Sequence, residues 1–351
     1  MENQNQTPHK RRVRYKGKYP KKFEEKYKEL QPEKYQETVE HVIRKGNTPA
    51  GMHISIMVKE ILDFLDIQPG QTGFDATLGY GGHTKAMLEC LKGQGHIYAT
   101  DVDPEESAKT KKRLEEQGLG EKILTVCLQN FCTIDEIAEK VGGFDFILAD
   151  LGVSSMQIDN PKRGFSFKAD GPLDLRLNQE KGISAAERLD TISREELAGM
   201  LYENSDEPYC EELAKAITDE IRRGNRIDTT TKLRNVIEKT LSFLPDNKEK
   251  KDIVKKTCQR TFQALRIDVN NEFEVLYEFM EKLPDALRPG GRVAILTFHS
   301  GEDKLVKKAL KAGYKAGIYS DYAKDVIRPS AQECAKNGRA RSTKMRWAVK
   351  A

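Results

Sequence analysis

Short apolar runs alternate with amphipathic segments along the first part of the chain that follows residue 47. Apolar residues recur at helical spacing from Ile54 to Leu65, which predicts an amphipathic helix. Thr133, with Glu136 three residues later, is expected to cap another helix. Alternating strands and helices favour parallel pairing in an α/β sheet. Strands are expected near 74–75, 96–101, 123–127 and 144–150, with helices starting near His83, Pro104 and Thr133.

The pattern changes between residues 161 and 265, where helix signals follow one another without a convincing strand. Ser193, with Glu196 three residues later, is typical of a capped helix start. Two more helices are expected over Tyr209–Arg223 and Thr230–Phe243. A wholly helical block inside a strand–helix chain predicts an inserted domain.

Strand signals return near the C-terminus. A buried strand is expected over 292–298, a helix near 302–311 and a closing edge strand over 344–349. The expected organisation is a tail of residues 1–46, a sheet domain built from 47–160 plus 266–351, and a helical domain of 161–265.

Composition agrees with a soluble protein that has a sizeable core, with 351 residues, 38% hydrophobic and 32% charged. No run of roughly eighteen apolar residues occurs, so no membrane span is expected. The basic N-terminus is not followed by an apolar region, which argues against a secretory signal. The six cysteines form no CxxC pair, which favours a reduced cytoplasmic chain without a cysteine-built metal site.

The net charge of +4 is modest, but the basic residues are unevenly distributed. Within the tail, positions 10–22 contain basic residues and two tyrosines but no acid. One interpretation is a solvated, disordered arm, and another is an arm that binds nucleic-acid phosphates. The two are compatible, because disordered arms can fold on nucleic acid. The basic residues are Lys10, Arg11, Arg12, Arg14, Lys16, Lys18, Lys21 and Lys22.

A glycine-rich turn follows the first expected strand and leads into a helix. Gly81 and Gly82 lack Cβ, so a ligand can approach their backbone closely, and the helix start offers N–H groups. Ligands of doubly wound sheets bind outside the carboxyl ends of the strands. The dinucleotide pattern asks for a third glycine where this chain has Thr84, which counts against a nicotinamide cofactor.

Asp101 ends the second expected strand. It follows Gly79 at about the 20-residue spacing at which an acid binds a ribose diol. The alternative role is a helix cap, but Asp103 suits that role better, because Pro104 would be the first helical residue. Asp101 is therefore expected to be free for a ligand.

Several motifs follow one another along residues 48–350: Asp75-x-Thr77-x-Gly79-x-Gly81-Gly82-His83, Asp101-x-Asp103-Pro104, Asp150-Leu-Gly-Val-Ser-Ser155, Arg163-Gly-Phe-Ser-Phe167, Asp170-Gly-Pro-Leu-Asp174, Thr261-Phe-Gln-Ala-Leu-Arg266 and Phe298-His-Ser300. Together they resemble the bacterial RsmH (MraW) family. Its members are S-adenosylmethionine-dependent methyltransferases that modify the N4 amine of a cytidine in small-subunit ribosomal RNA. The resemblance implies a class I methyltransferase fold, which is a Rossmann-like, mostly parallel α/β sheet with an inserted all-helical domain.

The resemblance also assigns cofactor-binding residues. Gly81, Gly82 and His83 would line the methionine end of S-adenosylmethionine, and Asp101 would hold the ribose. Without the motifs, Phe131 would be interpreted as a core residue, Gln157 as a loop residue and His83 as a helix-start histidine. With them, Phe131 matches the aromatic beside the adenine, and Asp150 and Gln157 match the remaining cofactor contacts.

The chemistry needs an acceptor for the weakly nucleophilic cytosine amine. Asp150, at the end of the fourth expected strand, is the candidate catalytic residue, and contact with the cofactor alone is its competing role. Phe165 and Phe167 could stack an unstacked base, although core packing is the expected role of at least one. His299 could act as a base, or have a structural or RNA-contacting role. No metal is required.

The sequence departs from the family pattern at Leu78, Tyr80, Met156 and Gly301, so a paralogue with another RNA target stays open. Two further function classes also stay open, a small-molecule methyltransferase and a non-catalytic RNA-binding assembly factor. The expected partner is ribosomal RNA or the small ribosomal subunit, without a membrane. The sequence leaves the oligomeric state open, and a homodimer is among the states it allows.

Overall fold

The computed structural model describes residues 55–351. The basic tail of residues 1–46, and the start of the helix expected at Ile54, lie outside the described residues. Within the described chain, no helix combines the length and apolar character needed to cross a membrane. All six cysteines are free, in agreement with the absence of a cysteine pair in the sequence.

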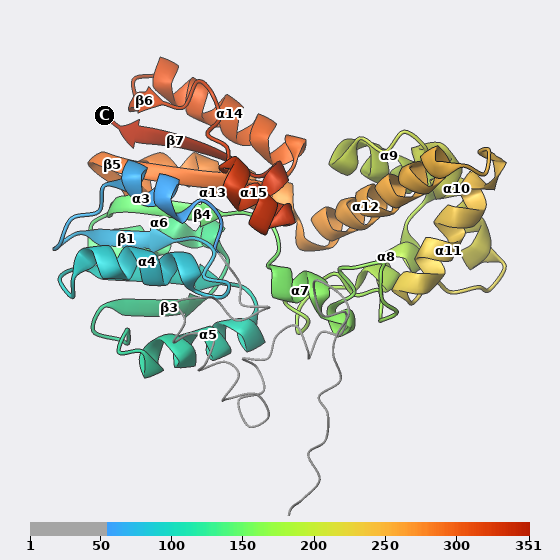
Figure 1. The fold of residues 1–351 in the computed structure, drawn as a ribbon, viewed down its shortest axis with the longest axis horizontal. Helices are drawn as coiled ribbons and strands as arrows, with labels where there is room; N and C mark the ends of the chain where they lie inside the picture. The colour runs from blue at the N-terminus through green and yellow to red at the C-terminus, as the bar shows by residue number, and fades with distance from the viewer. Residues whose placement is uncertain (1–54) are drawn as a thin grey trace, which may run out of the picture. The chain divides into compact units, whose positions relative to one another are not determined.

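One seven-stranded sheet, in the order β3-β2-β1-β4-β5-β7-β6, forms the centre of the described chain (Figure 1). The first five strands pair in parallel, whereas β7 is antiparallel to both β5 and β6. This order and these directions are those of the class I methyltransferase fold, so the predicted fold class is confirmed. The strands are β1 Thr72–Asp75, β2 His96–Asp101, β3 Leu124–Leu128, β4 Phe144–Asp150, β5 Leu287–Thr297, β6 Tyr319–Tyr322 and β7 Lys344–Lys350.

The edge of the sheet differs from the sequence prediction. The strand expected over 344–349 forms as β7, but it lies between β5 and β6 and is not an edge strand. The true edge, β6, was not predicted. Of its four residues only Tyr319 is buried, so it has no apolar run that a sequence pattern could reveal.

Helices cover both faces of the sheet, as expected for a doubly wound fold. On one face α6, α13 and α14 pack against the strands around a core that includes Phe74, Phe144 and Phe279. On the other face α3, α4 and α5 enclose Met87, Leu88 and other buried residues. These helices are α3 Val58–Leu65, α4 Gly82–Leu91, α5 Pro104–Glu116, α6 Ile134–Val141, α13 Glu272–Ala286 and α14 Ser300–Lys315.

The chain between β4 and α13 is helical, and its residues share a separate hydrophobic core. Its only extended pairing is an isolated bridge between Pro172 and Thr229. The expected boundary at residue 265 falls inside α12, so this helix continues from the helical block toward the sheet (Figure 1). The helices are α7 Ser155–Asp159, α8 Ala185–Thr191, α9 Arg194–Ser205, α10 Cys210–Arg222, α11 Thr230–Thr240 and α12 Lys248–Asn270.

The helix caps are mostly those that the sequence predicts. Ser193 accepts the Glu196 N–H at the start of α9, and Asp103 accepts two backbone N–H groups at the start of α5. Thr133 is the exception, because its hydroxyl donates to the Asn130 carbonyl instead of capping α6. Asn130 caps the single turn Phe131–Thr133 that leads into α6. A short 3₁₀ turn before a helix thus moved the cap three residues upstream.

Candidate active site

Three aspartates end neighbouring strands at one edge of the sheet. Asp75, Asp101 and Asp150 are the last residues of β1, β2 and β4, which lie side by side in the order β2-β1-β4. The carboxyl ends of parallel strands meet at a common edge, where ligands of such folds bind. Asp75 accepts the Thr77 N–H and the Thr84 hydroxyl and is only 1% exposed, so a ligand cannot reach it. Asp101 and Asp150 are therefore the acids that can serve a ligand.

One carboxylate oxygen of Asp150 has no hydrogen-bond partner within the described residues. Its Oδ2 lies 3.4 Å from His83 Nδ1, while Oδ1 is buried and has no hydrogen-bond partner within residues 55–351. Its backbone N–H donates to Thr77 Oγ1, which fixes the end of the strand. A buried acceptor without a partner is costly, so one in a native fold indicates a missing ligand or water. Asp150 Oδ1 is thus placed to accept a hydrogen bond from a bound molecule.

The His83 ring lies against the Asp150 carboxylate. His83 Nε2 lies 2.9 Å from the Ile56 carbonyl oxygen, which can only accept, so Nε2 carries a hydrogen. Nδ1 then faces Asp150 Oδ2, and a contact between an unprotonated nitrogen and an ionised carboxylate would be repulsive. Burial raises the pKa of the Asp150 carboxyl to about 6, opposed by His83 and assisted by two nearby carboxylates.

Asp101 is not as free as the sequence suggested. Its Oδ2 accepts the Gly79 N–H and its Oδ1 accepts the Asp103 N–H, both at 2.9 Å. Each oxygen retains a second acceptor position, which a ribose diol requires. Burial raises the pKa of the Asp101 carboxyl to about 6, although the two N–H bonds favour its charged form. The ribose role therefore stays a prediction, with Asp101 also bracing the glycine turn.

Gly81 is required by its backbone conformation and packing, whereas a side chain at Gly82 would meet only the rotatable Ser55 hydroxyl. Gly81 has a φ of 76°, and a Cβ at this position would lie 2.8 Å from Thr110 Cγ2. A Cβ on Gly82 would lie 2.0 Å from Ser55 Oγ. The conformation and packing of Gly81 explain that glycine without a ligand, and the close approach of the cofactor stays a prediction. The start of α4 has no side-chain cap, which leaves its N-terminal end suited to an anionic group.

The remaining predicted cofactor residues are held by protein contacts. The amide of Gln157 accepts the Ser154 N–H and donates to Asp103 Oδ2, so both of its polar ends are engaged. Phe131 is half-buried and packs edge-to-face on Phe279 with ring centroids 5.2 Å apart. Both residues follow strands whose carboxyl ends form this edge of the sheet. Their contacts with a cofactor stay predictions.

An ion pair that sequence reasoning missed joins this edge to the helical block. Arg163 Nη1 lies 2.5 Å from Asp103 Oδ2, and both side chains are buried. Its other terminal nitrogen donates to the backbone carbonyls of Arg176 and Leu177. Arg163 belongs to a recognisable motif, but nothing local in the sequence marks its partner, which lies 60 positions away. Breaking a buried pair typically costs about 3–5 kcal/mol.

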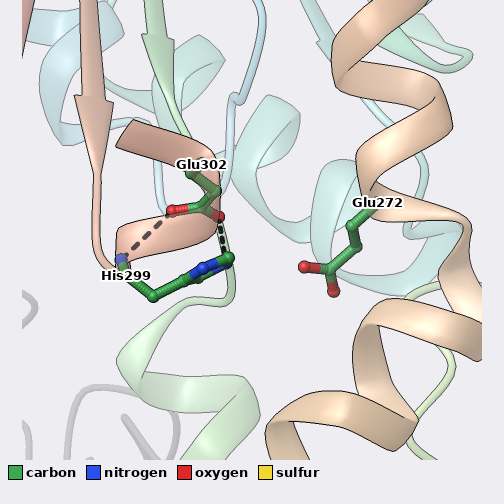
Figure 2. Close-up of side chains that lie close together, drawn as sticks. All are labelled: Glu272, His299 and Glu302. Carbon is green, nitrogen blue, oxygen red and sulfur yellow. Dashed lines mark hydrogen bonds and ion pairs between the residues drawn. The ribbon is translucent and has the colours of Figure 1, made fainter. Parts of the chain in front are cut away.

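Charged residues surround His299 next to Asp150. Figure 2 shows the Glu272 carboxylate pointing from α13 toward the pair formed by His299 and Glu302, and their ligand-type atoms lie within 4.8 Å of one another. His299 Nε2 is 3.1 Å from Glu302 Oε1, and Glu302 Oε2 accepts the Phe298 N–H. Arg266 holds Glu272 through two hydrogen bonds. These carboxylates already have partners, whereas neither ring nitrogen of His299 has a hydrogen-bond partner within residues 55–351.

Phe165 and Phe167, the two candidate stacking surfaces, behave differently. Phe165 is 9% exposed and belongs to the core of the helical block, as expected for at least one of the two. Phe167 is half-buried and meets Phe262 edge-to-face, with ring centroids 5.8 Å apart. Only Phe167 therefore retains a partly accessible ring.

Comparison with known proteins gives consistent results. The profile of the MraW methylase family matches residues 50–351. The chain is 86% identical over 343 residues to Ribosomal RNA small subunit methyltransferase H 1 of Agathobacter rectalis, covering 98% of each chain. It is 70% identical to the protein of the same name from Lachnoclostridium phytofermentans, over 99% of this chain and 95% of that one. Identity to Ribosomal RNA small subunit methyltransferase H 2 of Alkaliphilus metalliredigens is 61%, over 97% of each chain.

Proposed function

Because the chain belongs to the MraW methylase family, we propose that it transfers a methyl group from S-adenosylmethionine to the N4 amine of a cytidine in small-subunit ribosomal RNA. The observation that carries the proposal is the buried, unpartnered Oδ1 of Asp150 at the ligand edge of the sheet. The names of the relatives support ribosomal RNA as the substrate. The same proposal places the protein in the cytoplasm, with the helical block of about 161–265 recognising the RNA.

The described residues fit the proposed cofactor. The uncapped start of α4 suits its carboxylate, and Asp101 keeps acceptor positions for a ribose diol. Phe131 and Gln157 stand at the rim of the same edge. When bound, S-adenosylmethionine would supply a methyl group on a positively charged sulfur, which is already a strong methyl donor.

The protein's task is then to position and activate the cytosine amine. Its lone pair is shared with the ring, so the amine is a poor nucleophile until its nitrogen becomes pyramidal. Asp150 Oδ1 can accept a hydrogen bond from this amine, which favours that change, while His83 holds Oδ2. Holding the two reacting groups in line can remove about 7–11 kcal/mol of barrier. Water can take the proton from the product amine, so His299 is not needed as a base.

The cellular test is mass spectrometry of ribosomal RNA nucleosides from cells with and without this protein. The proposal expects N4-methylcytidine in small-subunit RNA to disappear when the gene is deleted and to return when it is restored. Unchanged N4-methylcytidine in the deletion strain would reject the proposed substrate.

The rate of methyl transfer should depend on pH through Asp150. Its carboxyl accepts a hydrogen bond best when ionised, and burial raises its pKa to about 6. We therefore expect the single-turnover rate to fall as the pH drops through about 6 and to be flat above about 7. The cofactor must be saturating, because burial raises the pKa of Asp101 to a similar value and its protonation would weaken cofactor binding. A rate that is constant from pH 5 to 8 under these conditions would contradict the acceptor role.

Deleting residues 1–46 should weaken RNA binding and leave cofactor binding unchanged. The basic cluster at positions 10–22 contains no acid, so it is expected to contact phosphates and release counterions. The plot of log affinity against log salt should therefore be less steep for the shortened protein. Equal slopes for the two proteins would show that the arm does not touch phosphate.

A further inference from the structure

A basic pocket of about 470 Å³ lies in the helical block, away from the strand ends. It is formed by the loop at 167–168, by α11, by the loop before α12 and by the first half of α12. Its apolar lining consists of Phe167, Val254 and Cys258. Its charged lining consists of Lys168, Arg234, Lys250, Lys251 and Lys255, with Glu238 and Asp246 as the acids. Five cations against two carboxylates leave a surplus of three positive charges.

Much of this positive charge is not neutralised by the protein. Arg234 is paired with Glu238 at 2.7 Å, and Lys250 donates to the Ser242 carbonyl. By contrast, Lys168, Lys251 and Lys255 have no ion-pair partner among residues 55–351 and are exposed. Lysines on a helix surface commonly serve solubility alone. Here they surround a concave apolar patch that contains an accessible aromatic ring, which solubility does not explain.

The pocket follows from the spacing of residues along α12. Lys251, Val254, Lys255 and Cys258 are three or four positions apart, so they lie on one face of the helix. One turn further, Phe262 packs edge-to-face on Phe167 and holds that ring at the pocket. The loop that carries Phe167 is itself anchored, because Arg163 is bonded to Asp103 at the start of α5. This ion pair links the loop of the pocket to the strand-end edge of the sheet.

We propose that this pocket binds one nucleotide of the substrate RNA at a distance from the methylated cytidine. A base would lie against Phe167 and the apolar lining, and the adjoining phosphates would contact Lys251 and Lys255. Single-stranded nucleic acids are bound in this way, by an aromatic surface flanked by cations that follow the backbone. The inference rests on the proposed function for the identity of the RNA.

The position of the pocket on α12 sets its distance from the reaction centre. Arg266, on the same helix, lies near the ion network beside Asp150, since its charge acts on Glu302. At about 1.5 Å per residue, Lys255 and Lys251 are about 17–22 Å along the helix from Arg266. A stacked strand rises about 3.4 Å per nucleotide, so the bound nucleotide is about five to seven positions from the target.

The test compares the unaltered protein with the double variant Lys251→Gln/Lys255→Gln. Affinity for small-subunit ribosomal RNA is measured at several salt concentrations. We expect a loss of about fivefold or more, and a log–log salt slope smaller by about 1.4, since each phosphate contact on a single strand contributes about 0.7. Lys307→Gln/Lys311→Gln on α14 is the matched control, because it removes the same charge from exposed lysines and should change neither quantity.

RNA fragments of two lengths show how far from the methylated cytidine the pocket contacts the RNA. With fragments that extend about two or about ten nucleotides on each side of the methylated cytidine, the double variant should lower kcat/KM for the long fragment only. An equal effect on both fragments, or unchanged RNA affinity in a variant that still binds the cofactor, would overturn the pocket assignment. The assignment would also be overturned if cytidine monophosphate bound in the pocket of the unaltered protein while the double variant kept its full affinity for RNA. If the unaltered protein methylates no ribosomal RNA but the double variant alone loses RNA affinity, the proposed function fails and the pocket assignment stands.

Discussion

Replacing Asp150 with alanine should lower the single-turnover rate of methyl transfer by about a hundredfold or more at saturating cofactor. This is the range in which a positioned acid–base group contributes to a rate. The alanine variant removes the only buried carboxylate oxygen at the strand ends that lacks a partner within residues 55–351. RNA affinity should change much less, because Asp150 is a single half-buried side chain and carries no positive charge for phosphate.

Asp150→Asn is the informative companion variant. Asparagine keeps an acceptor oxygen and nearly the same shape, so it should retain more activity than alanine. It loses the negative charge opposite His83, so it should not reach the rate of the unaltered protein. Full activity in both variants once the cofactor is saturating would mean that Asp150 only binds the cofactor. The amine would then have to be oriented by backbone carbonyls in 151–155.

Replacing Asp101 with alanine should weaken S-adenosylmethionine binding by about 1.5–3 kcal/mol, the range for a hydrogen bond to a charged group. This corresponds to roughly a 10- to 150-fold higher Kd, measured by calorimetry. Part of the loss would come from the turn, since Asp101 also accepts the N–H groups of Gly79 and Asp103. Asp101→Asn keeps one acceptor oxygen and should lie between alanine and the unaltered protein.

Thermal unfolding serves as the control for both Asp101 variants. A variant that melts like the unaltered protein and still binds the cofactor with unchanged affinity would reject the ribose assignment. Asp103→Asn is a useful contrast, because Asp103 caps α5 and pairs with Arg163. It should lower stability more than Asp101→Asn does.

Most strands of the sheet could be predicted from the sequence because the central strands are buried on both faces. β4 and the later part of β5 are continuous apolar runs, and such runs carry a strong local signal. β6 carries none, because three of its four residues are half-buried or exposed and its pairing with β7 is set by the rest of the fold. The local sequence is also misleading for α13. Pro284 lies in its last turn and argues locally against a helix.

The candidate site was predictable where a polar residue stands at the end of a strand that the sequence already predicts. Asp101 and Asp150 were found because each closes an apolar strand. The contacts of Arg163 and Glu302 were not found, since their partners depend on how distant segments meet. The reason for Gly81 was also incomplete, because its contact with Thr110, which leaves no room for a side chain, is recognisable only in the folded chain.

The most direct test of the account uses purified protein, small-subunit ribosomal RNA and S-adenosylmethionine with an isotopically labelled methyl group. After digestion to nucleosides, mass spectrometry identifies which atom received the label. The account predicts labelled N4-methylcytidine from the unaltered protein and a rate about a hundredfold or more lower with Asp150→Ala. Label on cytosine C5 or on a ribose oxygen, or no transfer to this RNA at all, would contradict it.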